Sequence, residues 1–378
     1  MASGIASAPG CDRCPAPLER MNNPRPSFFP ACASIAATFV LTACAASIRP
    51  ASDDPDVVQE QALQHSLSLN HRMTLQRRLD DVAIPLLEHS APFCGGDVRA
   101  SLGAHVASLW SFEKEERAAA KQTLHLDDRL TVLWTLDRKQ APATPLRAGD
   151  VLLSVGGKPL PAGEKGIDRL NAVLIDAART KPTKREGWLE AVVQREGQST
   201  ALRLPYTTAC NYTAVTRMKN EVHADNDGHE IVVNSALMRF FPDNRDLAIV
   251  LGHELANGVL SHGGKTRAVG IAAGIVDGAL GGTGLAQEAL SSPFSQQFDA
   301  EADYLGLYMV ATAGYDIDGA ERIWRELGVH TAGAKKKGFM STPPSSAKRF
   351  VAMRRTIAEI QAKTKNGAPL VPLAKSKS

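Results

Sequence analysis

The stretch VLGHELANGVLSH, residues 250–262, is an apolar segment that carries a His–Glu pair and, one helical turn later, an asparagine. We predict a helix from Asp243 to about His262, because apolar residues recur through this segment and an Asp or Asn can cap its first turn. On such a helix His253 and Asn257 face the same side. Imidazoles at both positions, with a Glu beside them, would hold a zinc ion. Asn257 therefore leaves open whether a metal binds here.

Two later segments carry further polar residues. The sequence FSQQFDAEADYLGLYMVATAG, residues 294–314, predicts a helix that ends at Gly314, and STPPSSAKRF occupies residues 341–350. Together with VVNSALMRFFPDNRDLAIVLGHELANGVLSHGG, residues 232–264, they resemble in content and order the zinc metallopeptidases of family M forty-eight. The resemblance covers about residues 210–356. It implies an α+β fold: a mainly helical zincin-type peptidase domain with a small sheet, at residues 207–356.

The resemblance also implies a role for each matching residue. His253 matches the first zinc ligand and Glu254 the catalytic base, while Asn257 replaces the second histidine ligand. Asp299, four residues before Asp303, stands where the family has a glutamate as the third ligand. Asp303 matches a carboxylate that orients a ligating imidazole.

The segment that closes over the site in this family is altered as well. Pro343 stands where the family carries a histidine, whereas Arg349 keeps the later arginine position. Asn257 offers zinc only a neutral amide oxygen, and Asp299 is one methylene shorter than a glutamate. We therefore expect Zn²⁺ to bind weakly or not at all, and the sequence leaves it uncertain whether the chain is an enzyme.

Two functions remain open from these residues. One is a zinc-dependent metalloendopeptidase that acts in proteolysis or quality control of cell-envelope proteins, with activity weakened or lost. The other is a catalytically inactive peptidase-fold lipoprotein that binds unfolded or C-terminal peptide segments. The retained Glu254, Asp299 and Asp303 favour the first function, and Asn257 and Pro343 favour the second.

Residues 1–44 have the layout of an export signal, with Met21 as the expected start. Arg25 is followed by an apolar stretch at residues 31–41 that is too short to span a bilayer. The segment ends in LTAC, which resembles a bacterial lipobox and implies that Cys44 is lipidated. We therefore expect a lipid anchor at the periplasmic face of the outer membrane. The alternative is a plain secretory signal in which Cys44 is incidental.

The part between the signal and the peptidase-like segment divides in two. We predict a tether and an amphipathic helical region at residues 45–123, with an interruption near Pro85. Residues 124–206 change to short strands and turns, and RAGDVLLSVGGKPL, residues 147–160, resembles the core motif of PDZ-type domains. This resemblance implies a PDZ-like domain that binds extended chain ends by strand addition. The alternative is a small β-rich domain without a peptide groove.

Composition limits the partners and the redox state. The net charge is only +3 over 378 residues, with no long basic stripe, which argues against nucleic acid. Envelope proteins or peptides, and the membrane through the lipid anchor, are the expected partners. In an exported chain Cys94 and Cys210 would form one disulfide, with two buried free thiols as the alternative. The tail, residues 357–378, is expected to be disordered.

Overall fold

The computed structural model describes residues 51–137, 142–180, 186–263, 295–331 and 347–373, all within the unit Ala51–Ser378. The expected export signal, Cys44 and Pro343 lie outside the described residues. In the described part of the chain, none of the helices has the length and apolar character needed to cross a membrane.

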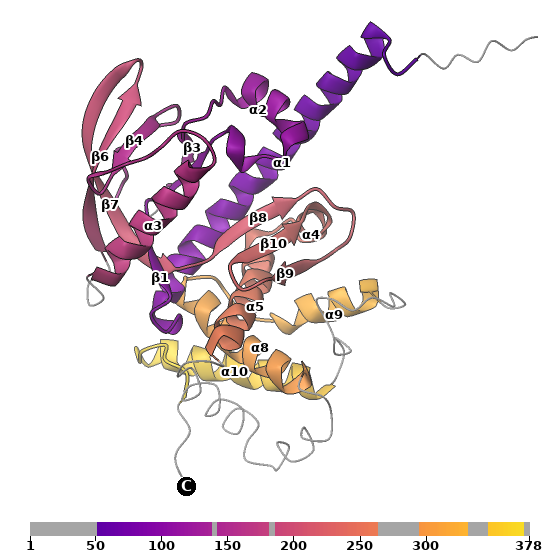
Figure 1. Cartoon of the computed structure of the whole chain (residues 1–378). Coiled ribbons are helices and arrows are strands. Elements are labelled where there is room, and N and C mark those ends of the chain that lie inside the picture. The colour runs from indigo at the N-terminus through magenta and orange to yellow at the C-terminus, as the bar shows by residue number, and fades with distance from the viewer. Residues whose placement is uncertain (1–50, 138–141, 181–185, 264–294, 332–346, 374–378) are drawn as a thin grey trace, which may run out of the picture. The chain divides into compact units, whose positions relative to one another are not determined.

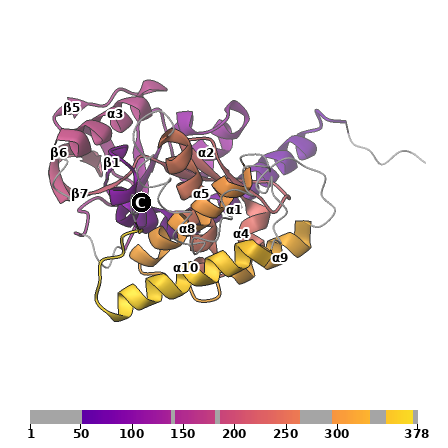
Figure 2. The same ribbon diagram turned by 90° about the horizontal axis from the view of Figure 1, so that it is seen from below.

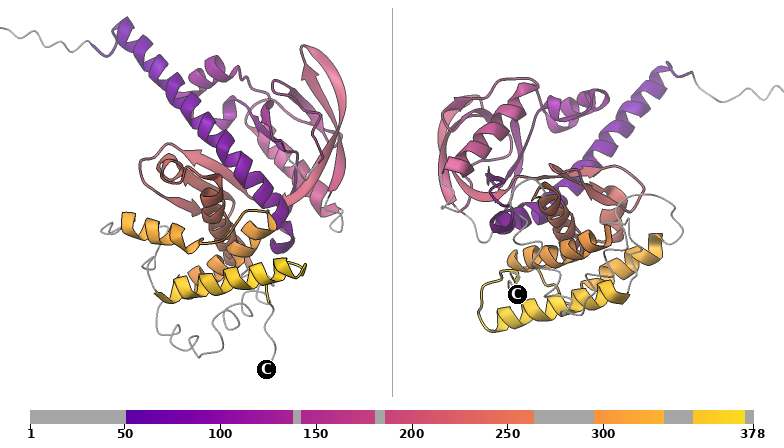
Figure 3. Two further views of the ribbon diagram at one scale, coloured as in Figure 1. Left: turned by 180° about the vertical axis from the view of Figure 1, so that it is seen from behind. Right: turned by 60° about the horizontal axis from the view of Figure 1, so that its bottom comes forward.

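Helix α1 (Pro55–Ser90) joins the two sheets of the fold. Its first turn has Asp54 as N-cap, whose carboxylate accepts the Asp56 N–H, and a proline at the first helical position. Figures 1 and 3 show α1 beside both sheets, and its C-terminal half contacts them with buried residues such as Leu79. The predicted interruption near Pro85 is wrong. The helix continues through that residue because the following leucines are buried in the core.

A seven-stranded antiparallel sheet forms the first β-layer, in the order β1-β7-β6-β4-β3-β2, with β5 paired to β4. The strands are β1 (Val98–Ser101), β2 (Ala104–Ala107), β3 (Thr131–Thr135), β4 (Val151–Val155), β5 (Lys158–Pro159), β6 (Glu186–Arg195) and β7 (Gln198–Cys210). Helices α2 (Arg117–Leu124) and α3 (Lys165–Thr180) and the short 3-10 helices η1 (Ala91–Phe93), η2 (Leu109–Ser111) and η3 (Lys114–Glu116) accompany it. Strands β1 and β2 lie in the segment for which the sequence predicted tether and helix.

The turn before β4 is held by one buried carboxylate. Asp150 accepts the Arg147 N–H at 2.8 Å, and its two oxygens each accept a hydrogen bond of 2.7 Å from the Arg195 guanidinium on β6. This pair explains the Gly-Asp step of the motif: the aspartate closes the turn and ties it to the neighbouring strand.

The second β-layer has three strands in the order β8-β10-β9, with β10 parallel to β8 and antiparallel to β9. They are β8 (Thr213–Arg217), β9 (Ala224–Asn226) and β10 (Glu230–Asn234). The helices that follow are α4 (Ser235–Phe240), α5 (Asn244–Gly263), α8 (Ser295–Thr312), α9 (Glu321–Thr331) and α10 (Ala347–Lys365). The fold is therefore mixed α+β.

Helix α10 corrects the expectation of a disordered tail from residue 357. The helix continues to Lys365, because Met353, Ile357 and Ile360 recur at helical spacing and are buried. Figure 2 shows α10 lying along α8 and α9. A disulfide joins Cys94 to Cys210 beside the first residue pair of β1 and β7.

Candidate metal-binding site

The site helices α5 and α8 touch through two glycines. A Cβ atom at Gly306 would lie 2.8 Å from the carbonyl oxygen of Gly252 and 3.0 Å from the backbone nitrogen of His253. A Cβ at Gly252 would lie 2.9 Å from the Gly306 oxygen. Only glycine permits so close an approach of two backbones. The contact brings His253 on α5 opposite Asp303, which lies one turn before Gly306 on α8.

Asp303 connects the histidine to a buried arginine. Its Oδ1 lies 2.9 Å from His253 Nδ1, and Arg349 on α10 binds the carboxylate with both Nε and Nη2, at 2.6 and 2.7 Å. All three side chains are buried. Burial alone would raise the pKa of Asp303, but the charges of Arg349 and His253 outweigh it and hold that pKa below its ordinary value. The carboxylate thus stays ionised and fixes the imidazole.

Trp324 on α9 packs on this group. Its ring lies 4.6 Å from the His253 ring, and the Arg349 guanidinium carbon lies 4.6 Å from the Trp324 ring centre. The indole therefore restricts both the imidazole and the guanidinium to one position, and it shields the Asp303 ion pair from water.

A second group of polar side chains stands beside the imidazole. Glu254 is buried, and burial raises its pKa well above the ordinary value; the charges of Asp225 and Asp299 add to the rise, and a hydrogen bond with Asn257 opposes it. Within the described residues, Glu254 Oε1, Asn257 Oδ1 and Asp299 Oδ2 are buried oxygens without a hydrogen-bond partner. Buried oxygens of this kind call for a bound ion or water.

The buried oxygens of this group, together with the imidazole, are the atoms that could coordinate a cation. In the described ranges, no three His, Cys, Asp or Glu side chains are arranged to hold a metal ion. The residues that would hold a cation here are His253, Asp299 and Asn257, of which Asn257 and Asp299 contribute the buried oxygens. One nitrogen and two oxygens fit a divalent cation, but with less affinity for Zn²⁺ than two imidazoles and a glutamate would give.

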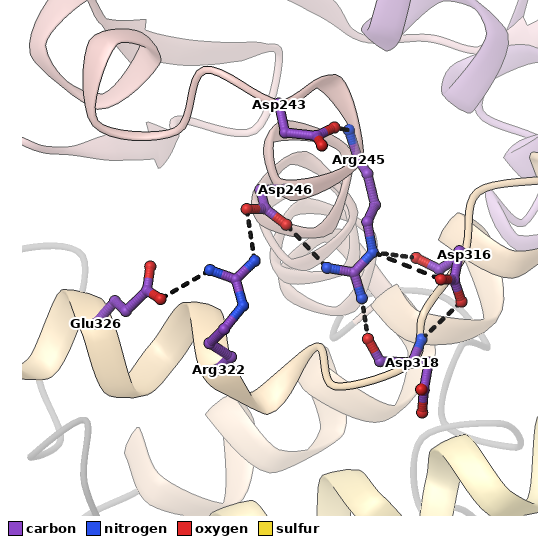
Figure 4. Close-up of polar contacts among 7 residues, drawn as sticks. All are labelled: Asp243, Arg245, Asp246, Asp316, Asp318, Arg322 and Glu326. Carbon is purple, nitrogen blue, oxygen red and sulfur yellow. Dashed lines mark hydrogen bonds and ion pairs between the residues drawn. The ribbon is translucent and has the colours of Figure 1, made fainter.

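An ion-pair network fixes the first turn of α5 (Figure 4). Asp243 caps the turn by accepting the Arg245 N–H at 2.8 Å. The buried carboxylate of Asp246 accepts from Arg245 at 2.9 Å and from Arg322 of α9 at 2.7 Å. Arg322 also donates to Glu326 at 2.7 Å. The network sets the position of α9, and with it Trp324, relative to the site helix.

The structure places together all the site residues that the sequence predicts within the described ranges: His253, Glu254, Asn257, Asp299, Asp303 and Arg349. The prediction missed Trp324, Asp225 and Asn226, whose Nδ2 donates to the Glu254 carbonyl oxygen at 2.9 Å. No motif marks these three positions, since they reach the site from elements distant in sequence.

Comparison with known proteins agrees with this geometry. Residues 183–357 match the sequence model described as Peptidase family M48. The match begins at the start of β6, so it includes β6 and β7, which the sequence interpretation assigned to the PDZ-like domain.

Three curated relatives carry the name mitochondrial metalloendopeptidase OMA1. The protein from Schizosaccharomyces pombe is 30% identical over 146 residues, which are 36% of this chain and 43% of the relative. The Arabidopsis thaliana protein is 34% identical over 128 residues, 32% of this chain and 26% of the relative. The Saccharomyces cerevisiae protein is 24% identical over 162 residues, 36% of this chain and 47% of the relative. The chain thus spans less than half the length of each. Residues 183–357 thus match Peptidase family M48 and show distant similarity to the OMA1 metalloendopeptidases.

Proposed function

We propose that this chain is a metal-dependent endopeptidase of the cell envelope whose affinity for its metal is weakened by Asn257. One observation carries the proposal: the buried oxygens of Glu254, Asn257 and Asp299 lack partners beside an imidazole that is held rigidly in place. Leaving buried acceptors unsatisfied costs about 1–3 kcal/mol each. A bound cation would remove that cost.

Each residue would contribute a separate action. His253, Asp299 and Asn257 would hold the cation, which when bound supplies a Lewis acid for a peptide carbonyl. Asp303 accepts a hydrogen bond from His253 Nδ1, so Nε2 is the ring nitrogen that would bind the cation. Glu254 takes up and releases a proton at its carboxylate, and its buried position favours retention of that proton between the two transfers.

A second function has its own observation. Asn257 hydrogen-bonds the side chain of Glu254, and a carboxylate engaged in this way is less available as a base. On this alternative the chain binds unfolded or C-terminal peptide segments and cleaves nothing. The PDZ-like interpretation of residues 124–206 supports peptide binding under either function.

The proposed location rests on sequence alone. The LTAC segment that ends at Cys44 supports lipidation and an anchor at the periplasmic face of the outer membrane. Labelling cells with a radioactive fatty acid tests it: Cys44→Ser should abolish incorporation, and label that persists in this variant would exclude the anchor.

The deciding experiment measures metal content and casein cleavage of the purified chain. Elemental analysis after loading with Zn²⁺ or Mn²⁺ is compared for the unmodified chain, Asn257→His and Glu254→Gln. Asn366→His serves as the matched control, because Asn366 is exposed and follows the last residue of α10. Stoichiometric metal in the unmodified chain, with cleavage that Glu254→Gln abolishes, supports the endopeptidase. Neither metal nor cleavage, with both gained only in Asn257→His, supports the binding protein instead.

A further inference from the structure

A cavity of about 580 Å³ lies between α1, strands β1 and β2, and helix α3. Its volume is within the range of about 300–1,000 Å³ that ligand pockets usually have. The α3 side is apolar, with Ile167, Leu170 and Leu174 on one helical face. None of the residues of the candidate metal site lines it.

Of the three arginines that line the cavity, Arg99 has no acidic partner among the residues that the structure describes. Arg72 pairs with Glu116 at 3.0 Å, and Arg217 pairs with Glu230 at 3.9 Å. Arg99, on β1, donates only to the side-chain amide oxygen of Asn171 on α3, at 3.1 Å, and no ion pair with a carboxylate is formed within the described residues.

The aspartate of the same cavity is already engaged by three other side chains. Asp80 on α1 accepts from Gln76 at 2.7 Å, lies 2.7 Å from His105 Nδ1, and accepts from the Trp134 indole at 3.1 Å. Three of the roughly four acceptor positions of this carboxylate are therefore occupied, and within the described residues it forms no ion pair with Arg99. Burial lowers the pKa of Arg99, and no neighbouring charge contributes to that shift. An anion that enters the cavity would therefore form strong, charge-assisted hydrogen bonds with this guanidinium.

The strands beside Arg99 offer a second kind of contact. Strands β1 and β2 are the two end strands of the sheet order, so each has a single partner strand in the described part of the chain. Ala100, Ser101 and Ala104 of these strands line the cavity. An extended chain could pair with such an edge through its backbone.

We propose that this cavity binds a carboxylate carried on an extended peptide, with the carboxylate on the Arg99 guanidinium and the peptide backbone along β1, on the side that no described strand pairs. The site requires neither a metal ion nor peptide-bond cleavage, so it is independent of the endopeptidase proposal. It rests on the second candidate function, peptide binding, and gives that function a location and a ligand chemistry. A carboxylate can form two parallel hydrogen bonds with the fork of a guanidinium, which a lysine ammonium cannot reproduce.

The test uses three pools of fluorescein-labelled random heptapeptides and the immobilised chain carrying Glu254→Gln, in EDTA. One pool has a free C-terminus, one is amidated, and one is amidated with a fixed central aspartate. We expect at least one carboxylate pool to be retained about 10-fold more strongly, or more, than the plain amidated pool. The reason is that loss of one partner of a desolvated charge pair weakens binding by this factor or a larger one. Stronger retention of the pool with a free C-terminus would identify the bound carboxylate as a chain end. Stronger retention of the aspartate pool would identify it as a side chain.

Variants assign the effect to the guanidinium. Arg99→Met should reduce retention of the carboxylate pool to the level of the amidated pool, and Arg99→Lys should restore part of it. Arg203→Met is the matched control, because Arg203 is 64% exposed in its side chain and lies outside the cavity. An unchanged melting temperature of Arg99→Met shows that the fold is intact. Equal retention of all pools, or undiminished retention by Arg99→Met, would overturn the proposal. Because cleavage is disabled throughout, either result is independent of the endopeptidase proposal.

Discussion

The disulfide between Cys94 and Cys210 makes a quantitative prediction about stability. The two residues are 116 positions apart, so the bond closes most of the first β-layer into one loop. By the chain-entropy relation, a loop of that length restricts the unfolded chain by about 5 kcal/mol at 25 °C. Replacing either cysteine by serine should remove this stabilisation, since a bond needs both sulfurs.

The bond also acts on native neighbours. Cys210 pairs with Val98 in the β1–β7 register, and β1 has only four residues to hold it in the sheet. Loss of the bond should therefore loosen β1 first. Because Cys210 and Arg99 both line the α1–α3 cavity, peptide retention should fall together with stability.

Thermal unfolding of three variants tests this: Cys94→Ser, Cys210→Ser and the double substitution. We expect a decrease in melting temperature of roughly 10 °C in each, the lower end of the usual range for a chain larger than 250 residues. The melting temperature of the double variant should equal that of each single variant. Dithiothreitol should lower the melting temperature of the unmodified chain only. A decrease in melting temperature of less than roughly 2 °C, which corresponds to about 1 kcal/mol, would refute the reasoning. So would a double variant that is twice as destabilised as either single one.

Three further predictions concern the scaffold. Gly306→Ala would place a methyl group against the Gly252 backbone, which cannot rotate away; we expect a net loss of about 1–2 kcal/mol after the gain in helix propensity, measured by urea unfolding. Asp246→Asn leaves two arginines without their shared carboxylate, and we expect a loss of about 1–3 kcal/mol in the same assay. Burial raises the pKa of Asp150, but the hydrogen bonds from Arg195 and from the Arg147 N–H lower it by more. The net pKa is therefore below the ordinary value of 3.8. Its stabilisation is therefore present above pH 3.8 and lost as the pH falls through the lower folded-state pKa. The melting temperatures of the unmodified chain and Asp150→Asn should accordingly differ by a constant amount above pH 3.8 and converge as the pH falls below it. A gap that stays constant below pH 3.8 would contradict this.

The sequence predicts the peptidase-like part well because its polar residues are spaced by helical turns. His253 and Asn257 must share one face of α5, and Asp299 and Asp303 one face of α8. The match to Peptidase family M48 confirms the family resemblance. The zinc ligand set, the PDZ-like domain and the lipid anchor stay predictions.

Other features could not be predicted because they depend on contacts between distant segments. Strands β1 and β2 have only four residues each, so the apolar–polar alternation of Val-Arg-Ala-Ser in β1 is too short to stand out in the sequence. Trp324 reaches the site only because α9 folds back on α5. The isolation of Arg99 is likewise invisible in sequence, since it depends on which carboxylates other arginines occupy.

The rigid contact between α5 and α8 has a consequence for how such a chain can change over generations. The Gly252–Gly306 approach and the hold of Asp303 and Arg349 on the imidazole do not involve position 257. The residue at position 257 can therefore change during evolution without loss of the contacts that stabilise the fold. An asparagine codon differs from a histidine codon by a single base. Loss and recovery of a histidine at position 257 are thus neighbouring genotypes, separated by one mutation.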